Sequence, residues 1–126
     1  MLPFEYGASF MSIQDALDLC AGKKAGVLTA PVMEKVNACR AVTEQLAAGS
    51  VPVYGINTGF GPLCTTAILP ADTVTLQYNI LESHSVGVGA PVGLSIARLM
   101  LILKVHALAK GYSGVQAATL ERILWH

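Results

Sequence analysis

Residues 53–61 read Val-Tyr-Gly-Ile-Asn-Thr-Gly-Phe-Gly and place a phenol in a stretch of irregular backbone. Three glycines fall within seven residues, and Pro52 and Pro62 flank the stretch. Proline fixes φ and removes a hydrogen-bond donor, while glycine permits positive φ and close backbone approach. A helix or a central strand would tolerate this pattern poorly. The stretch therefore predicts a shaped loop, over about residues 50–67, that presents Tyr54; an ordinary connector is the alternative.

The spacing of the glycines argues against a phosphate-binding loop. It does not follow G-x-G-x-x-G, and no Lys-Ser or Lys-Thr pair comes after it. Asn57 and Thr58 have two possible uses. Their side chains either bond nearby backbone and close the loop, which is the favoured interpretation, or contact a ligand directly.

Outward from this loop the sequence predicts helices joined by Gly and Pro breaks. Ser12 followed by Asp15 resembles a capping box at the start of the first helix, which should run for about ten residues. A short strand is expected before it, over residues 4–10. The remaining helices are expected over residues 29–49, 70–85, 93–110 and 113–126.

The helix predicted over residues 93–110 is apolar nearly all round, so we expect it to be buried on most sides. It carries Arg98, Lys104 and His106, which argue against a membrane span. Because His106 lies in an apolar context, it is expected to be a core histidine with a satisfied hydrogen bond.

The composition excludes several classes of partner. Eight basic and eight acidic residues give zero formal charge, so no basic patch indicates nucleic acid. Only 13% of the residues are charged, against about 25% in a typical domain. A chain with so few charges predicts that much apolar surface is covered by more of a longer chain, by other subunits, or by both.

The three cysteines, Cys20, Cys39 and Cys64, form no C-x-x-C motif. Neither a disulfide framework nor a zinc site is indicated, and no His/Cys/Asp/Glu cluster supports another metal. Buried free thiols in a reducing, cytoplasmic compartment fit best.

Three stretches together resemble one family. Residues 53–61 resemble the tyrosine loop of the aromatic amino-acid ammonia-lyases and aminomutases, the histidine ammonia-lyase group. Residues 76–89 resemble that family's Leu-Gln, Ser-His and Gly-x-Gly pattern, and residues 108–115 resemble the segment after its first long helix. The resemblance covers roughly residues 9–126. It implies a mainly α-helical fold with a few short strands near the N-terminus.

The resemblance also implies roles for two residues. Tyr54 would remove a substrate proton, although a phenol is a poor base unless its surroundings stabilise the phenolate. His84 would line the pocket for the substrate's aromatic ring, where an imidazole suits histidine or tyrosine better than phenylalanine. A third candidate comes from the loop itself and not from the resemblance: Gly61 could donate its N–H toward a substrate. Without the resemblance, His84 reads as a C-terminal helix cap.

The chemistry that the resemblance implies is incomplete in this chain. The family's electrophile is a methylidene-imidazolone (MIO) made from an Ala-Ser-Gly tripeptide, which this sequence lacks. Residues 1–126 are therefore expected to form a single N-terminal segment of a longer homotetrameric lyase, inactive alone. The lack of a stop signal in the last helix predicts the same.

The expected substrate is an aromatic amino acid, with histidine going to urocanate first and tyrosine to coumarate second. No nucleic acid or membrane partner is expected. Two alternatives stay open: an aminomutase of the same family, and a short non-catalytic paralogue that acts as an assembly module.

Overall fold

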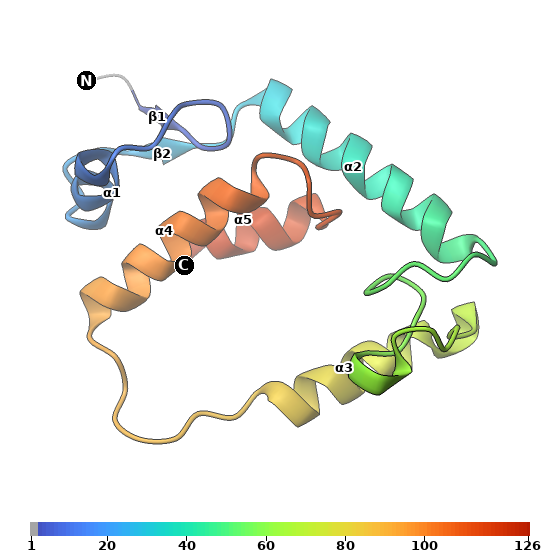
Figure 1. Ribbon diagram of the computed structural model, residues 1–126. Helices are drawn as coiled ribbons and strands as arrows, with labels where there is room; N and C mark the ends of the chain where they lie inside the picture. Colours follow the sequence, from blue (N-terminus) through green and yellow to red (C-terminus); the bar gives the residue numbers. More distant parts are fainter. Residues whose placement is uncertain (1–2) are drawn as a thin grey trace. The chain divides into compact units, whose positions relative to one another are not determined.

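The structure, a computed structural model, describes residues 3–126 and divides into two compact units (Figure 1). One unit combines Met1–Ala41 with Pro91–His126, and the other comprises Val42–Ala90. The helices are α1 (Ile13–Cys20), α2 (Ala30–Ala48), α3 (Thr73–His84), α4 (Leu94–Leu108) and α5 (Ala117–Trp125). Short 3-10 turns form at η1 (Gly61–Leu63) and η2 (Pro70–Asp72). Strands β1 (Phe4–Glu5) and β2 (Gly26–Val27) pair in parallel, with Phe4 opposite Gly26. The prediction of a mainly helical fold with short N-terminal strands is confirmed.

The core of the first unit forms where α4 packs against both α1 and α5 (Figure 1). Its buried residues come from both strand and helix segments: Phe4, Tyr6, Leu19, Val32, Val36, Val105, Ala109 and Leu120. Leu120 and Val36 are almost fully excluded from solvent, at 0% and 1% exposure. Val32 and Val36 on α2 lie on the face that their spacing predicts. On α1 the apolar spacing predicts a buried face with Ile13 and Leu17, but these two are exposed and Leu19 enters the core instead.

The prediction of a core histidine is confirmed only in part, because His106 packs beside the core but is half-buried. Its Nδ1 accepts a hydrogen bond from the backbone N–H of Gly7 at 3.3 Å. Its ring lies 5.7 Å from that of Phe4 and 6.5 Å from that of Tyr6. Burial, and secondarily the charge of Lys110, lower the pKa of His106. The neutral ring therefore links α4 to the segment after β1.

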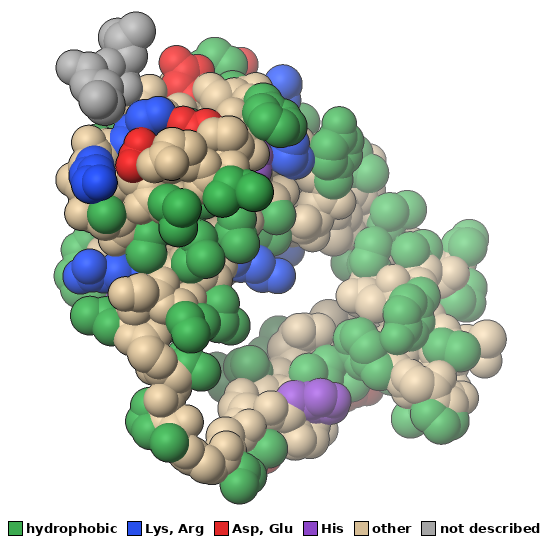
Figure 2. Space-filling model, turned by 60° about the vertical axis from the view of Figure 1, so that its left-hand side comes forward, with side chains coloured by type: hydrophobic (Ala, Val, Ile, Leu, Met, Phe, Trp, Pro, Cys, Tyr) green, Lys and Arg blue, Asp and Glu red, His purple; other side chains and the backbone are tan. Residues whose placement is uncertain are grey.

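The expectation that α4 is buried on most sides is wrong for this chain. Of its residues only Val105 is buried, while Leu94, Ile96 and Met100 are more than half exposed. Figure 2 shows hydrophobic side chains over much of the visible surface, with Lys, Arg, Asp and Glu gathered on one part of it. The apolar residues all round α4 show how much of the helix surface could be buried. In this chain α1 and α5 cover only part of that surface.

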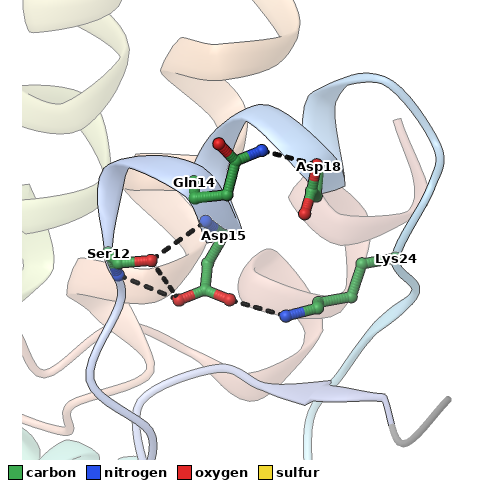
Figure 3. A network of polar contacts seen from close by, with 5 residues as sticks. All are labelled: Ser12, Gln14, Asp15, Asp18 and Lys24. Atoms are coloured by element: carbon green, nitrogen blue, oxygen red, sulfur yellow. Dashed lines mark hydrogen bonds and ion pairs between the residues drawn. The ribbon is translucent and has the colours of Figure 1, made fainter.

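The start of α1 is fixed by a reciprocal capping box, which confirms the Ser12–Asp15 prediction (Figure 3). The Asp15 N–H donates to Ser12 Oγ at 3.1 Å, and Asp15 Oδ2 accepts from the N–H of Ser12 at 3.0 Å. The other carboxylate oxygen accepts from Lys24 Nζ at 2.6 Å. Hydrogen bonds from Lys24 and then from Ser12 hold the pKa of Asp15 well below its usual range.

The expected start of the fifth helix needs correction. The fifth helix begins at Ala117 rather than near residue 113, with Gln116 as its N-cap. Gly114 has a φ of +62°, its N–H donates to Cys39 Sγ and its carbonyl accepts from Arg40 Nη1. These bonds hold Gly114 in a left-handed turn that a helix cannot include.

The three cysteines form no disulfide within residues 3–126, and the expectation that they are buried is wrong. Cys20 and Cys39 are half-buried and Cys64 is exposed, because Cys64 follows η1 on the surface of the second unit. Within residues 3–126, no helix has both the length and the apolar character needed to cross a membrane.

Candidate functional site

The segment around Tyr54 is a tight turn at the surface of the second unit. The carbonyl of Val53 accepts hydrogen bonds from the N–H groups of Ile56 and Asn57, at 3.0 and 3.2 Å. This turn projects the Tyr54 side chain outward, where it is 64% exposed. Its ring packs edge-on against Phe60, with the centroids 5.8 Å apart. The predicted loop that presents Tyr54 is therefore confirmed.

Asn57 holds this loop in place from beneath. Its side chain is only 4% exposed, and its Oδ1 accepts from the Val53 N–H at 2.7 Å. Its Nδ2 lies within 3.0–3.3 Å of the carbonyls of Leu46, Gly49 and Val51. One buried amide therefore connects the turn that carries Tyr54 to the C-terminal end of α2.

The loop is closed a second time beyond Asn57. Thr58 forms an isolated antiparallel bridge with Ala67, and the Ile68 N–H donates to the Asn57 carbonyl at 2.9 Å. Thr58 is 1% exposed and its hydroxyl donates to the Gly59 carbonyl at 3.0 Å. Asn57 and Thr58 thus close the loop, which was the favoured interpretation of the two.

Two glycines have separate reasons to be glycine. A Cβ on Gly59 would lie 2.6 Å from Leu63 Cβ and 3.0 Å from the Leu63 carbonyl oxygen. Gly61 has open space around it but a φ of +56°, which side chains rarely adopt. Close packing therefore selects glycine at 59, and backbone conformation selects it at 61, where η1 begins.

His84 is the last residue of α3 and its side chain is exposed. Its Nδ1 lies 2.8 Å from Ser83 Oγ and 3.1 Å from the carbonyl oxygen of Ile80. The Ser83 hydroxyl also lies 2.7 Å from the Asn79 carbonyl oxygen. The contact with the Ile80 carbonyl runs back along α3 to the preceding turn. It engages Nδ1 and leaves Nε2, on the other side of the ring, without a role in it.

All three candidate residues, Tyr54, Gly61 and His84, belong to the Val42–Ala90 unit and are exposed. Tyr54 and His84 contact different neighbours, Phe60 and Ser83. Neither partner was predicted from the sequence. The adjacency of Ser83 to His84 near a helix end was the available signal for the second, since serine in a helix often bonds backward to a carbonyl.

Two cavities lie in the other unit and are lined by other residues. The larger, of about 410 Å³, lies between α1 and α4 and is lined mainly by apolar side chains, with His106 and Lys110 among its residues. The smaller, of about 150 Å³, lies between α4 and α5.

The charged side chains of the second unit are all acidic. The unit carries Glu44, Asp72 and Glu82, and the sequence has no Lys or Arg between Arg40 and Arg98.

The fold and the tyrosine loop define a class of protein. The profile of the aromatic amino acid lyase family matches residues 11–126, and the chain belongs to that family. Histidine ammonia-lyase of Myxococcus xanthus (strain DK1622) is 40% identical over 114 residues, which cover 90% of this chain and 22% of that protein.

Solved structures agree with this assignment. Tyrosine aminomutase from Streptomyces globisporus superimposes with a TM-score of 0.88 at 27% identity, over 98% of this chain and 24% of that one. Histidine ammonia-lyase from Trypanosoma cruzi gives a TM-score of 0.82 at 32% identity, again over 98% and 24%. The chain corresponds to the N-terminal portion of these proteins and spans 22% of the length of the curated relatives it matches.

Proposed function

We propose that this chain supplies part of the active site of an ammonia-lyase that acts on an aromatic L-amino acid. Histidine, giving urocanate, is the leading substrate, and tyrosine, giving coumarate, is the second. The observation that carries the proposal is the loop geometry: an exposed Tyr54 on a turn that the buried Asn57 holds rigidly. A positioned phenol is what proton abstraction next to a leaving ammonia requires.

Tyr54 is the proposed base. It is exposed at the tip of a turn, so a substrate can reach its hydroxyl without displacing the core. Gly61 lies further along the same loop in a backbone conformation without a side chain, which lets a substrate approach its N–H. For Tyr54 to act as a base, groups outside this loop must stabilise its phenolate, because the second unit carries acidic residues and no Lys or Arg.

His84 is proposed to contact the far end of the substrate's ring. A polar group at this position favours a ring that carries a nitrogen or hydroxyl, because an apolar ring would leave the imidazole unpaired. The helix-cap bond to Ile80 fits this use, since it engages Nδ1 and leaves Nε2 for a ligand.

Other parts of the reaction must come from outside these residues. The family's MIO electrophile is made from an Ala-Ser-Gly tripeptide. This sequence has no such tripeptide, so its residues cannot supply that electrophile. A cation for the substrate's carboxylate is also missing from the second unit. We therefore propose that residues 1–126 form a single N-terminal segment of a longer cytoplasmic homotetramer, and that they are inactive alone.

An aminomutase is the second candidate function, favoured by the similarity to the Streptomyces globisporus structure. It would use the same tyrosine and the same electrophile, and it would return the ammonia to the neighbouring carbon. A non-catalytic assembly module is the alternative of a different class. Product analysis in a full-length chimera separates all three, since a lyase gives an unsaturated acid, an aminomutase gives a β-amino acid and a non-catalytic module gives no product.

The decisive experiment is a chimera in which the matching 114 residues replace their counterpart in the Myxococcus xanthus histidine ammonia-lyase. We expect the chimera to release ammonia from an aromatic amino acid and the isolated 126-residue chain to release none. In the chimera, Tyr54→Phe keeps the ring and removes the hydroxyl, and should lower kcat by about 10²–10⁴-fold. Tyr78→Phe, at another exposed tyrosine of the same unit, is the control.

His84→Leu should act on substrate preference rather than on elimination itself. We expect kcat/KM for phenylalanine to rise by more than about 10-fold relative to histidine or tyrosine. Steady-state kinetics on the three amino acids measure this change. Equal losses on all three would make His84 a structural cap, and a folded but inactive chimera would contradict the proposed function.

A further inference from the structure

The side chain of His84 has a defined donor and acceptor pattern that follows from its neighbours. A neutral imidazole carries one N–H, on either Nδ1 or Nε2, and the other nitrogen is an acceptor. Which form is present follows from the bonds that the ring makes. At His84 three oxygen atoms at the end of α3 decide the question: Ser83 Oγ and the carbonyl oxygens of Ile80 and Asn79.

A proton on Nδ1 satisfies every one of these contacts. The Nδ1–H donates to Ser83 Oγ at 2.8 Å and to the Ile80 carbonyl at 3.1 Å. The Ser83 hydroxyl then keeps its own proton for the Asn79 carbonyl at 2.7 Å, the nearer of its two carbonyl neighbours, since the Ile80 carbonyl lies 3.2 Å from the same Oγ. A carbonyl oxygen only accepts, so each acceptor in this arrangement faces a donor.

A proton on Nε2 leaves two conflicts. The bare Nδ1 would face the Ile80 carbonyl oxygen, acceptor against acceptor, at 3.1 Å. Ser83 would have to donate its single proton to Nδ1, which leaves its oxygen against the Asn79 carbonyl oxygen at 2.7 Å. Two close contacts between lone pairs disfavour this form.

We infer that Ser83 is a positioning residue: together with the Ile80 carbonyl it holds the Nδ1–H form of His84, so that Nε2 is an acceptor. A ligand group that meets Nε2 must then be a donor. The inference rests on the proposed function only in its second part, the identity of the ligand. If the ligand is the proposed substrate, a donor at Nε2 limits it to aromatic amino acids whose ring ends in N–H or O–H.

The first test measures the proton position directly. Magic-angle-spinning ¹⁵N NMR of the histidine-labelled 126-residue chain, at a pH where the ring is neutral, distinguishes the two nitrogens, and His84→Gln assigns the signal. We expect the proton on Nδ1. Ser83→Ala removes one acceptor and should shift the ratio of the two forms by about 2- to 12-fold toward Nε2–H. Alanine favours a helix, so the end of α3 should survive the change.

Two further variants control the measurement. Ser83→Thr keeps the hydroxyl and should restore the Nδ1–H form, because threonine makes the same backward bond in a helix. Ser85→Ala, one residue beyond His84, should leave the ratio unchanged. A wild-type spectrum dominated by Nε2–H, or no shift in Ser83→Ala, would overturn the inference whatever the chain catalyses.

The second test asks about the ligand, in the Myxococcus xanthus chimera. The ratio of kcat/KM for tyrosine to that for phenylalanine should fall in Ser83→Ala and recover in Ser83→Thr. An unchanged ratio beside a changed NMR signal would overturn the donor-ligand part alone. If the chimera acts on no aromatic amino acid, the proposed function fails, while the NMR result still decides how Ser83 positions His84.

Discussion

At the scale of single residues, Asp15 is one of the few charged residues of the chain, and both of its carboxylate oxygens have partners. One of its oxygens completes the capping box and the other pairs with Lys24. We predict that Asp15→Asn, which keeps the shape but removes the charge, lowers the free energy of unfolding at pH 7 by weakening both. Urea denaturation followed by circular dichroism measures the loss. Asp18→Asn on the same helix, where the carboxylate accepts a hydrogen bond from Gln14, should cost less.

The pH dependence of this effect has a fixed sign. The folded pKa of Asp15 lies below its unfolded value of about 3.9, so its stabilisation is fully present above that value. It is lost as pH falls through the folded pKa. The difference between wild type and Asp15→Asn should therefore be constant above about pH 5 and should shrink below about pH 4. A difference that grows on acidification would contradict this account.

At the scale of elements, two glycines of the second unit differ in their sensitivity to added volume: Gly59 in the tyrosine loop and Gly87 beyond the end of α3. Gly59→Ala places a Cβ against Leu63, and we predict a loss of about 1–3 kcal/mol in the free energy of unfolding, typical of overpacking. Gly87 has open space and no positive φ, so Gly87→Ala should be neutral or stabilising by about 0.4–1 kcal/mol. Equal effects from the two substitutions, measured by hydrogen exchange or urea denaturation, would argue against the packing.

Element boundaries were predictable where their causes are local. The Ser12–Asp15 spacing gave the start of α1, and the glycines of residues 53–61 gave the Tyr54 loop. The start of α5 was missed because Gly114 is held by Cys39 and Arg40, which are far away in sequence. The Ser83–His84 contact was missed for another reason: the adjacency of the two residues made the contact possible, but it does not give the side-chain rotamers and the ring orientation that form it.

At the scale of the whole molecule, apolar surface dominates the behaviour of the isolated chain. Leu94, Ile96 and Met100 are 68%, 56% and 61% exposed along α4 alone. We predict that the purified chain associates and that light scattering gives a mass above 13.2 kDa that rises with concentration. A constant monomer mass over a tenfold concentration range would contradict the prediction.

Substitutions on α4 test whether its exposed apolar side chains cause the association. Replacing Leu94 and Met100 together by Lys removes exposed apolar side chains without touching the buried Val105, and should reduce association. Ser95→Lys adds charge to the same helix but removes no apolar area, so it should reduce association less.

The four bonds of Asn57 also couple the loop to a helix end during folding. The acceptors of its amide group are the carbonyls of Leu46, in the last turn of α2, and of Gly49 and Val51, which follow that helix. We therefore expect the turn beneath Tyr54 to become ordered together with that helix end, so that fraying there also opens the tyrosine loop.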